Sequence, residues 1–184
     1  MEASLPFPDD EAECWFVLRD LKRSNARHPA YRQLAEMGLR VFTPMHEVVT
    51  LVRGQRVRKD VPFLRDLLFV REHYSELRTV VERDPTLQFR YVRGGYCTPM
   101  TVRTAEMECF IRAVESTFRP RYYLPEEISP SMIGRQVLIV GGSLNGYEGH
   151  LLSIRGSRVK RLFIDLPGLL SAGVEVSPEY IRLL

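Results

Sequence analysis

Apolar residues recur along the first two thirds of the chain with two alternating periods. A nearly continuous apolar run at residues 14–18 favours a central strand, and residues 88–92 alternate with period two, as a half-buried strand does. Helical spacing covers residues 29–39, 74–82 and 104–117. The remaining extended segments are residues 40–44, 48–52 and 63–70, with a hairpin tip at 53–56. Strands mixed with helices in this order predict an α+β fold, in which helices cover one antiparallel sheet.

The last third of the chain follows a different pattern. Apolar periodicity stops after residue 118, and prolines at 120, 125 and 130 punctuate a stretch that we interpret as a linker, residues 119–130. Short strands and turns follow, which predicts a small, SH3-like β-barrel over residues 131–184. Its expected strands are residues 136–140, 148–154, 158–165, 173–176 and 179–183.

Three glycines lie between the first two of these strands. Gly142, Gly146 and Gly149 are spaced four and then three residues apart, and Leu144 and Tyr147 flank the middle one. Glycine adopts positive φ without a steric cost, so this spacing indicates a tight loop at the rim of the barrel.

The net charge of +3 conceals an uneven distribution. Residues 1–13 contain five acidic residues and no base, and this composition indicates a disordered acidic tail. Residues 14–120 contain 19 Lys and Arg against 12 Asp and Glu. This excess of positive charge favours binding to a polyanion such as nucleic acid. The alternative is a basic surface that serves only solubility.

Several functional classes find no support in the sequence. The N-terminus lacks the basic and apolar segments of a secretory signal, and no apolar run reaches the roughly 18 residues of a membrane span, so we expect a cytoplasmic protein with no membrane partner. The glycine loop lacks the lysine of a phosphate-binding loop, and the four histidines show no metal-binding spacing. We therefore expect neither catalysis nor a cofactor nor a metal. The three cysteines, Cys14, Cys97 and Cys109, are far apart and predict no disulfide framework.

The order of several short motifs resembles the NusG-type transcription elongation factors. Residues 15–18, 41–44, 61–64, 68–70 and 89–95 carry the resemblance in the first domain, and the glycine loop resembles the KOW motif of the second. The resemblance implies a polymerase-binding domain at residues 14–118, the linker 119–130 and a KOW barrel at 131–184. Leu64-Arg65-Asp66-Leu67 stands where housekeeping members usually carry Phe-Pro-Gly-Tyr. This departure resembles specialised antiterminators of the UpxY type and, more distantly, RfaH-like paralogues.

The resemblance implies that the first domain docks on the clamp helices of the largest subunit of RNA polymerase. The alternative is that these side chains face the core of their own sheet, because alternation divides a strand between two faces. The matching positions are Phe63, Leu64, Leu67, Phe69 and Tyr91.

The resemblance also places two basic clusters near upstream or non-template DNA. Phosphate contacts would make binding salt-sensitive with little sequence preference. The alternative is a solvated charged face. The clusters are Lys22, Arg23 and Arg27 after the first strand, and Arg53, Arg56, Arg58 and Lys59 in the hairpin.

In the family, the barrel binds a ribosomal protein or a termination factor near its loops, and Leu144 and Tyr147 are the candidates here. The expected function is to suppress pausing and termination on particular long operons, such as those for polysaccharide synthesis. Two alternatives remain. One is a KOW-type module that binds RNA or the ribosome, and the other is a housekeeping factor that couples transcription to termination.

Overall fold

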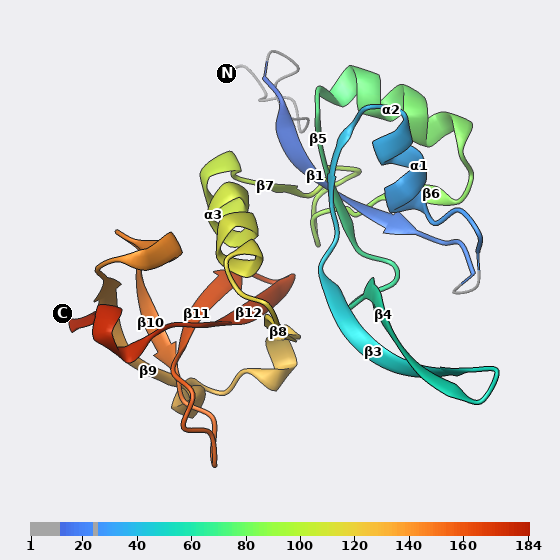
Figure 1. Cartoon of the computed structure of the whole chain (residues 1–184). Coiled ribbons are helices and arrows are strands. Elements are labelled where there is room, and N and C mark those ends of the chain that lie inside the picture. Colours follow the sequence, from blue (N-terminus) through green and yellow to red (C-terminus); the bar gives the residue numbers. More distant parts are fainter. Residues whose placement is uncertain (1–11, 24–25) are drawn as a thin grey trace, which may run out of the picture. The chain divides into compact units, whose positions relative to one another are not determined.

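The computed structural model describes residues 12–23 and 26–184 (Figure 1). Of the expected acidic tail, residues 1–11 lie outside this part of the chain. The chain forms two compact units: one contains the N-terminal residues up to Met45 together with residues 62–104, and the other contains residues 46–61 and 105–184.

The first unit is built on an antiparallel sheet with β1 near its centre. The strand order is β2-β5-β1-β6, and β7 pairs with the part of β1 that β6 leaves free. The apolar run in β1 explains this position, because a central strand is buried on both faces. The strands are β1 (Cys14–Asp20), β2 (Arg40–Phe42), β5 (Leu68–Glu72), β6 (Leu87–Phe89) and β7 (Thr101–Val102).

Two helices, α1 (Ala30–Glu36) and α2 (Tyr74–Arg83), pack on one face of this sheet. Both were predicted from their apolar spacing. Gly38, at φ +85°, follows α1, and its N–H donates to the Ala35 carbonyl at 3.0 Å, which ends the helix as expected. The core between helices and sheet contains Phe16, Leu18, Leu34, Leu68, Val70, Leu77 and Phe89.

A two-stranded hairpin, β3 (Met45–Val52) and β4 (Gln55–Pro62), follows β2. Its tip residues Arg53 and Gly54 both have positive φ, at +50° and +80°, as a hairpin turn that matches the twist of its strands requires.

The predicted strand at residues 63–70 is partly wrong. Residues 63–67 form a turn, in which the Leu67 N–H donates to the Leu64 carbonyl at 3.4 Å, and β5 begins only at Leu68. The exposed Arg65 and Asp66 interrupt the apolar run at this point.

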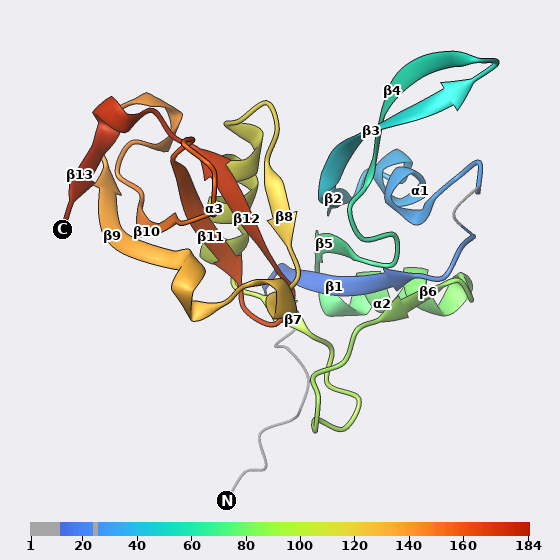
Figure 2. The same cartoon turned by 90° about the horizontal axis from the view of Figure 1, so that it is seen from below.

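The second unit contains the helix α3 (Thr104–Glu115) and a curved antiparallel sheet in the order β13-β9-β10-β11-β12-β8 (Figure 2). Together the two units confirm the predicted α+β fold. The strands are β8 (Arg121–Tyr123), β9 (Ile133–Ile139), β10 (Glu148–Leu152), β11 (Arg161–Leu166), β12 (Leu170–Glu175) and β13 (Ile181–Leu183). Short 3₁₀ turns lie at Pro125–Glu127, Pro130–Met132, Gly142–Leu144 and Pro178–Tyr180.

Strand β8 lies inside the segment that the prolines mark as a linker. It pairs with β12, where Tyr122 is opposite Ala172, and the Tyr122 ring stacks on Phe110 of α3 with centroids 6.4 Å apart. Three residues are too few to produce a detectable period, so the sequence pattern gave no sign of this strand.

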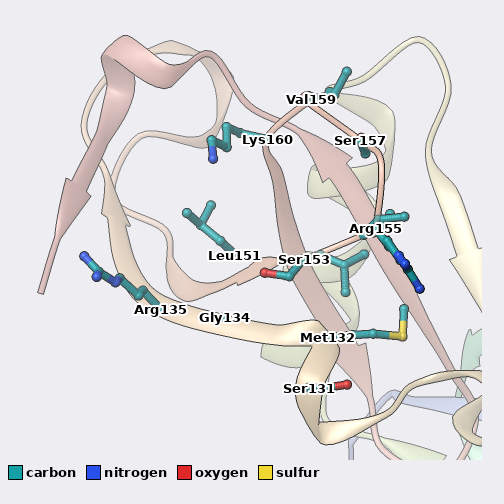
Figure 3. A pocket seen from close by; sticks show the side chains of 12 residues that line it. Ser131, Met132, Gly134, Arg135, Leu151, Ser153, Arg155, Ser157, Val159 and Lys160 are labelled. Carbon is teal, nitrogen blue, oxygen red and sulfur yellow. The ribbon is translucent and has the colours of Figure 1, made fainter.

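A pocket opens where β9 bulges against β10 and the loop after β10 folds over (Figure 3). Its volume is about 620 Å³, which is within the range of ligand sites. No motif or periodicity in the sequence indicates it.

The fully buried ring of Phe16 predicts a large loss of stability on truncation. Its centroid lies 5.8 Å from that of Phe89 and 6.0 Å from that of Tyr74. We expect Phe16→Ala to lower the free energy of unfolding by about 3–5 kcal/mol, measured by urea denaturation. Leu51→Ala, at a side chain that is 72% exposed on the hairpin, is the control and should change it by less than about 0.5 kcal/mol. A loss below about 1 kcal/mol for Phe16→Ala would contradict the assigned core.

Candidate functional site

Among the apolar candidates, Phe69 lies in β5 and Phe63, Leu64 and Leu67 lie in the turn before it. Tyr91 follows β6 and forms an isolated bridge with Pro99. Phe69 pairs with Val17 of β1, while Leu68 and Val70 face the helices α1 and α2. Alternation therefore places Phe69 on the sheet face opposite the helices. The Phe69 ring lies 6.2 Å from that of Phe42, between centroids.

These candidates differ sharply in exposure. Leu67 and Phe69 are buried, with 1% and 0% of their surface exposed, whereas Tyr91 is 49% exposed. Phe63 and Leu64 are half-buried in the turn before β5. A side chain contributes to docking by losing exposed apolar area, so Tyr91 offers the most accessible contact among the five.

The basic cluster after β1 contains Lys22, which is bound to neighbouring side chains, and two exposed arginines. The Asp20 carboxylate accepts hydrogen bonds from the backbone N–H groups of Lys22 and Ala30, at 2.9 and 2.8 Å, and so fixes both ends of this loop. Lys22 is engaged with Gln33 and lies 3.4 Å from the Asp84 carboxylate. Arg23 and Arg27 are exposed.

The negative charge of Asp84 holds the Lys22 side chain in place. The hydrogen bond from the Thr86 hydroxyl, and then the charge of Lys22, keep the pKa of the Asp84 carboxyl below its usual value, although burial opposes them. The carboxylate is therefore ionised at neutral pH. Lys22 consequently acts as a tie between the loop and the segment after α2, which the sequence could not reveal.

The hairpin presents its cations to solvent together with apolar side chains. Arg53, Arg56 and Lys59 are exposed, while Arg58 donates to Glu47 at 3.3 Å. Sequence reasoning missed the exposed apolar residues between them, because alternation alone does not say whether anything covers a two-stranded sheet. These residues are Val49, Leu51, Val52 and Val57, which are 42–72% exposed.

The glycine loop has the backbone that its sequence indicated. Gly142 and Gly146 have φ of +65° and +83°, and a side chain at Gly149 would meet Leu162 at 3.2 Å. Leu144, however, is only 3% exposed and Tyr147 is half-buried. As the structure stands, neither residue presents a broad exposed surface to a partner.

Tyr147 packs on α3. Its hydroxyl donates to the Cys109 carbonyl at 3.3 Å, and the guanidinium of Arg112 lies 5.9 Å from the centre of its ring. Burial is the main reason that the pKa of the Tyr147 hydroxyl is raised to about 12, with Cys109 adding to the effect and Arg112 opposing it.

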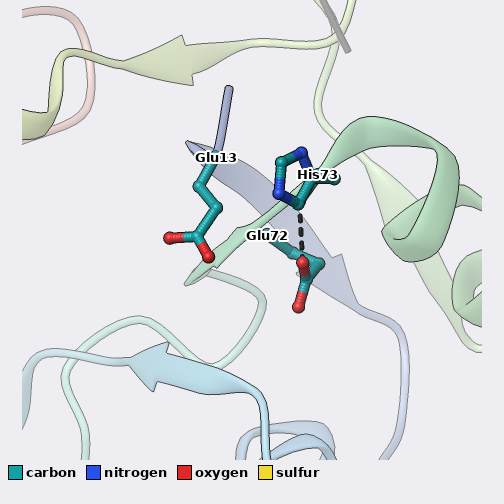
Figure 4. Close-up of side chains that lie close together, drawn as sticks. All are labelled: Glu13, Glu72 and His73. Atoms are coloured by element: carbon teal, nitrogen blue, oxygen red, sulfur yellow. Dashed lines mark hydrogen bonds between the residues drawn. The ribbon is translucent and has the colours of Figure 1, made fainter. Parts of the chain in front are cut away.

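Glu13, Glu72 and His73 bring their potential ligand atoms within 4.8 Å of one another (Figure 4). Other contacts already engage both carboxylates. The Arg71 guanidinium lies 3.1 Å from Glu13, and the His73 backbone N–H donates to Glu72 at 2.9 Å. The positive charge of Arg71 would oppose a cation here, so we assign no metal site to this cluster.

The fold is that of an α+β protein in two units, with an exposed hairpin that carries several cations. Residues 13–111 match the family model described as transcription termination factor NusG, which is more than half of the chain. The chain therefore belongs to the NusG family of transcription elongation and termination factors. Membership implies binding to RNA polymerase and a role without enzymatic activity. A search of curated proteins found no match for this chain.

Among the described residues, no helix combines the length and the apolar character that crossing a membrane requires.

The environment of Tyr147 predicts an alkaline loss of stability. Because its folded-state pKa of about 12 lies above the usual 10.0, the group stabilises the fold fully below pH 10, and this contribution is lost as the pH rises through 12. We expect the free energy of unfolding of the wild type to fall between pH 10 and 12. Tyr147→Phe, which cannot ionise, should show a smaller fall.

Denaturant unfolding at pH 9 and pH 11.5 measures this difference, with Tyr180→Phe in the same unit as the control. The control should retain the wild-type loss. An equal loss in the wild type and in Tyr147→Phe would show that the Tyr147 hydroxyl is not held as described.

Proposed function

We propose that this chain is a specialised antitermination factor whose first domain docks on the clamp helices of the largest subunit of RNA polymerase. The observation that carries the proposal is that Tyr91, within the residues that match the family model, keeps 49% of its surface exposed. Trp15, Val17 and Phe69 lie on the face opposite α1 and α2 and are each 0% exposed. Because these three side chains are already covered, they stabilise the sheet, and docking depends on an exposed side chain such as Tyr91.

Within this proposal, the candidate contacts have different roles. Tyr91, with half of its surface accessible, is the first anchor, and the half-buried Phe63 and Leu64 extend the contact. Leu67 and Phe69 are buried, so they touch the polymerase directly only after a rearrangement that exposes them. Aromatic anchors of this kind carry much of the energy of an interface.

The hairpin supports contact with upstream or non-template DNA. Arg53, Arg56 and Lys59 are exposed and can pair with phosphates, whereas Arg58 is held by Glu47. The exposed Arg23 and Arg27 form a second candidate contact. Such contacts position a protein on nucleic acid and carry little sequence information.

The mechanism is a shift of population. A protein that binds the closed clamp better than the open one increases the closed, elongating fraction and reduces pausing. The turn Leu64-Arg65-Asp66-Leu67 supports the specialised, UpxY-like type, with long polysaccharide operons as the proposed targets.

In this proposal, residues 14–118 contact the polymerase and residues 131–184 offer the barrel to a second partner. Residues 119–130 connect the two, and β8 within them pairs with the C-terminal sheet. A ribosomal protein or termination factor would reach Leu144 and Tyr147 only after the glycine loop separates from α3, because Tyr147 is bonded to Cys109.

The proposed polymerase contact predicts a specific effect at Tyr91. Tyr91→Ala should weaken binding to purified RNA polymerase by about tenfold or more, because loss of an aromatic anchor costs roughly 2 kcal/mol. Biolayer interferometry measures the dissociation constant. The matched control is Phe118→Ala, which removes an aromatic side chain that is 88% exposed but not among the proposed contacts. Equal affinities for the two variants and the wild type would reject the assignment of Tyr91.

The hairpin predicts a change in salt dependence. Arg53→Ala combined with Arg56→Ala should reduce the slope of log affinity against log salt for an elongation complex by about 1.4, at about 0.7 per lost phosphate contact on single strands. Arg83→Ala combined with Arg182→Ala removes two exposed cations elsewhere and should leave the slope unchanged. If both pairs give the wild-type slope, the hairpin cations do not contact phosphates.

A further inference from the structure

The pocket in the C-terminal sheet lies at the opposite end of β10 from the glycine loop. Residues 140–147 join β9 to β10, whereas residues 153–160 leave the far end of β10 and lead into β11. The cavity of about 620 Å³ is lined by four residues between Ser131 and Arg135 on one side and by eight residues between Leu151 and Lys160 on the other. It is therefore separate from every surface assigned above.

A β-bulge forms one wall. His150 pairs with Gln136 and Leu152 pairs with Ile133, so Gly134 and Arg135 of β9 lie opposite the single residue Leu151. A side chain at Gly134 would come within 2.9 Å of the Leu151 carbonyl oxygen, so only glycine fits. Bulges redirect neighbouring side chains and are frequent beside functional sites.

Positive charge gathers at this pocket. Four of the six Lys and Arg in residues 131–184 lie in the two bordering segments, residues 131–136 and 153–160, which contain no acidic residue. Three of the four, Arg135, Arg155 and Lys160, line the cavity. In the described parts of the chain, no carboxylate pairs with any of these three side chains, and all three are exposed. The local charge is therefore available to an anionic ligand.

The loop over the pocket is anchored from below. The buried guanidinium of Arg161 donates to the Ser157 hydroxyl at 3.1 Å and to Glu175 at 2.8 Å. This contact ties the middle of the loop to β11 and β12. Arg155 and Lys160 thus lie on either side of Ser157, which Arg161 holds in place.

Hydroxyls and an apolar floor accompany the cations (Figure 3). Ser131, Ser153 and Ser157 line the cavity, and Leu151 lies between Ser153 and Lys160 in the view of Figure 3. Arg135 and Arg155 point to opposite sides of it. Arginine, lysine and serine are the side chains that contact nucleic-acid phosphates and sugars, and an apolar floor suits the face of a base.

We propose that this pocket binds a single-stranded nucleic acid through its phosphates, with the cations on both sides of Leu151 contacting successive phosphates. A nucleotide presents an anionic phosphate beside an apolar ring, which matches the mixture of cations and apolar floor. A segment of Asp and Glu alone offers carboxylates without such a ring. The proposal is independent of the polymerase docking, because it uses neither the N-terminal sheet nor the hairpin.

The test measures binding of the full chain to fluorescein-labelled 12-nucleotide single strands of RNA and of DNA by anisotropy over a range of salt concentrations. Arg155→Ala combined with Lys160→Ala should weaken binding about tenfold at low salt and reduce the salt slope by about 1.4. Arg121→Ala combined with Arg182→Ala is the matched control, because both cations are exposed on other strands of the same sheet. The control should bind within about twofold of the wild type, since it removes no proposed phosphate contact.

Ultraviolet crosslinking of the wild type, followed by mass spectrometry, supplies a second readout that needs no variant to fold. Crosslinks should map to residues 131–135 and 151–160. Crosslinks confined to the hairpin, or an unchanged affinity and salt slope for the pocket variant, would overturn the proposal. Displacement of the labelled strand by polyglutamate as efficiently as by unlabelled nucleic acid would overturn it too, and would assign the pocket to acidic protein segments.

Discussion

Burial of β1 on both faces is the constraint on which the N-terminal unit depends. Phe16 and Leu18 pack towards α1 and α2, while Trp15 and Val17 point to the other side, and all four are 0% exposed. A strand that is apolar on both faces has no face to offer to water, so both sides of its sheet must be covered. The helices satisfy this requirement on one side. On the other side Trp15 and Val17 are equally buried, so the stability of the sheet depends on cover over both of its faces.

Elements with a local signature were predictable from the sequence. The helices α1, α2 and α3 lie where the apolar spacing placed them, and Gly38 ends α1 through its positive φ. The turn at residues 63–67 and the strand β8 were not predicted correctly. In the first case an apolar run concealed the exposed pair Arg65 and Asp66, and in the second a three-residue strand owes its existence to pairing with β12. The turn and the strand both depend on contacts with residues that are distant in the sequence, and the apolar period of a short segment carries no information about such contacts.

The candidate sites show the same division between residue type and environment. The sequence identified the cations of the hairpin and of the first loop, but not that Glu47 holds Arg58 or that Asp84 holds Lys22. Likewise, it identified Leu144 and Tyr147 from their place in the glycine loop, but their exposure depends on α3 and on the interior of the sheet. The sequence states residue type and order directly, whereas exposure and ion pairing are set by contacts between different segments of the chain.

The distribution of charge connects the hairpin with the pocket beside β10. Each region carries only a few accessible cations, so each alone would bind nucleic acid weakly at physiological salt. Two weak sites on one chain gain affinity when both engage the same polymer, because the second contact then forms at a high effective concentration. That gain requires a connection that can span the two contact points, and it disappears if the connection cannot reach.

A net charge of only +3 is compatible with this arrangement, because the acidic residues near the N-terminus offset the total without neutralising either region. Modest overall charge limits indiscriminate attraction to polyanions, while the two local clusters retain the charge that bivalent binding would use.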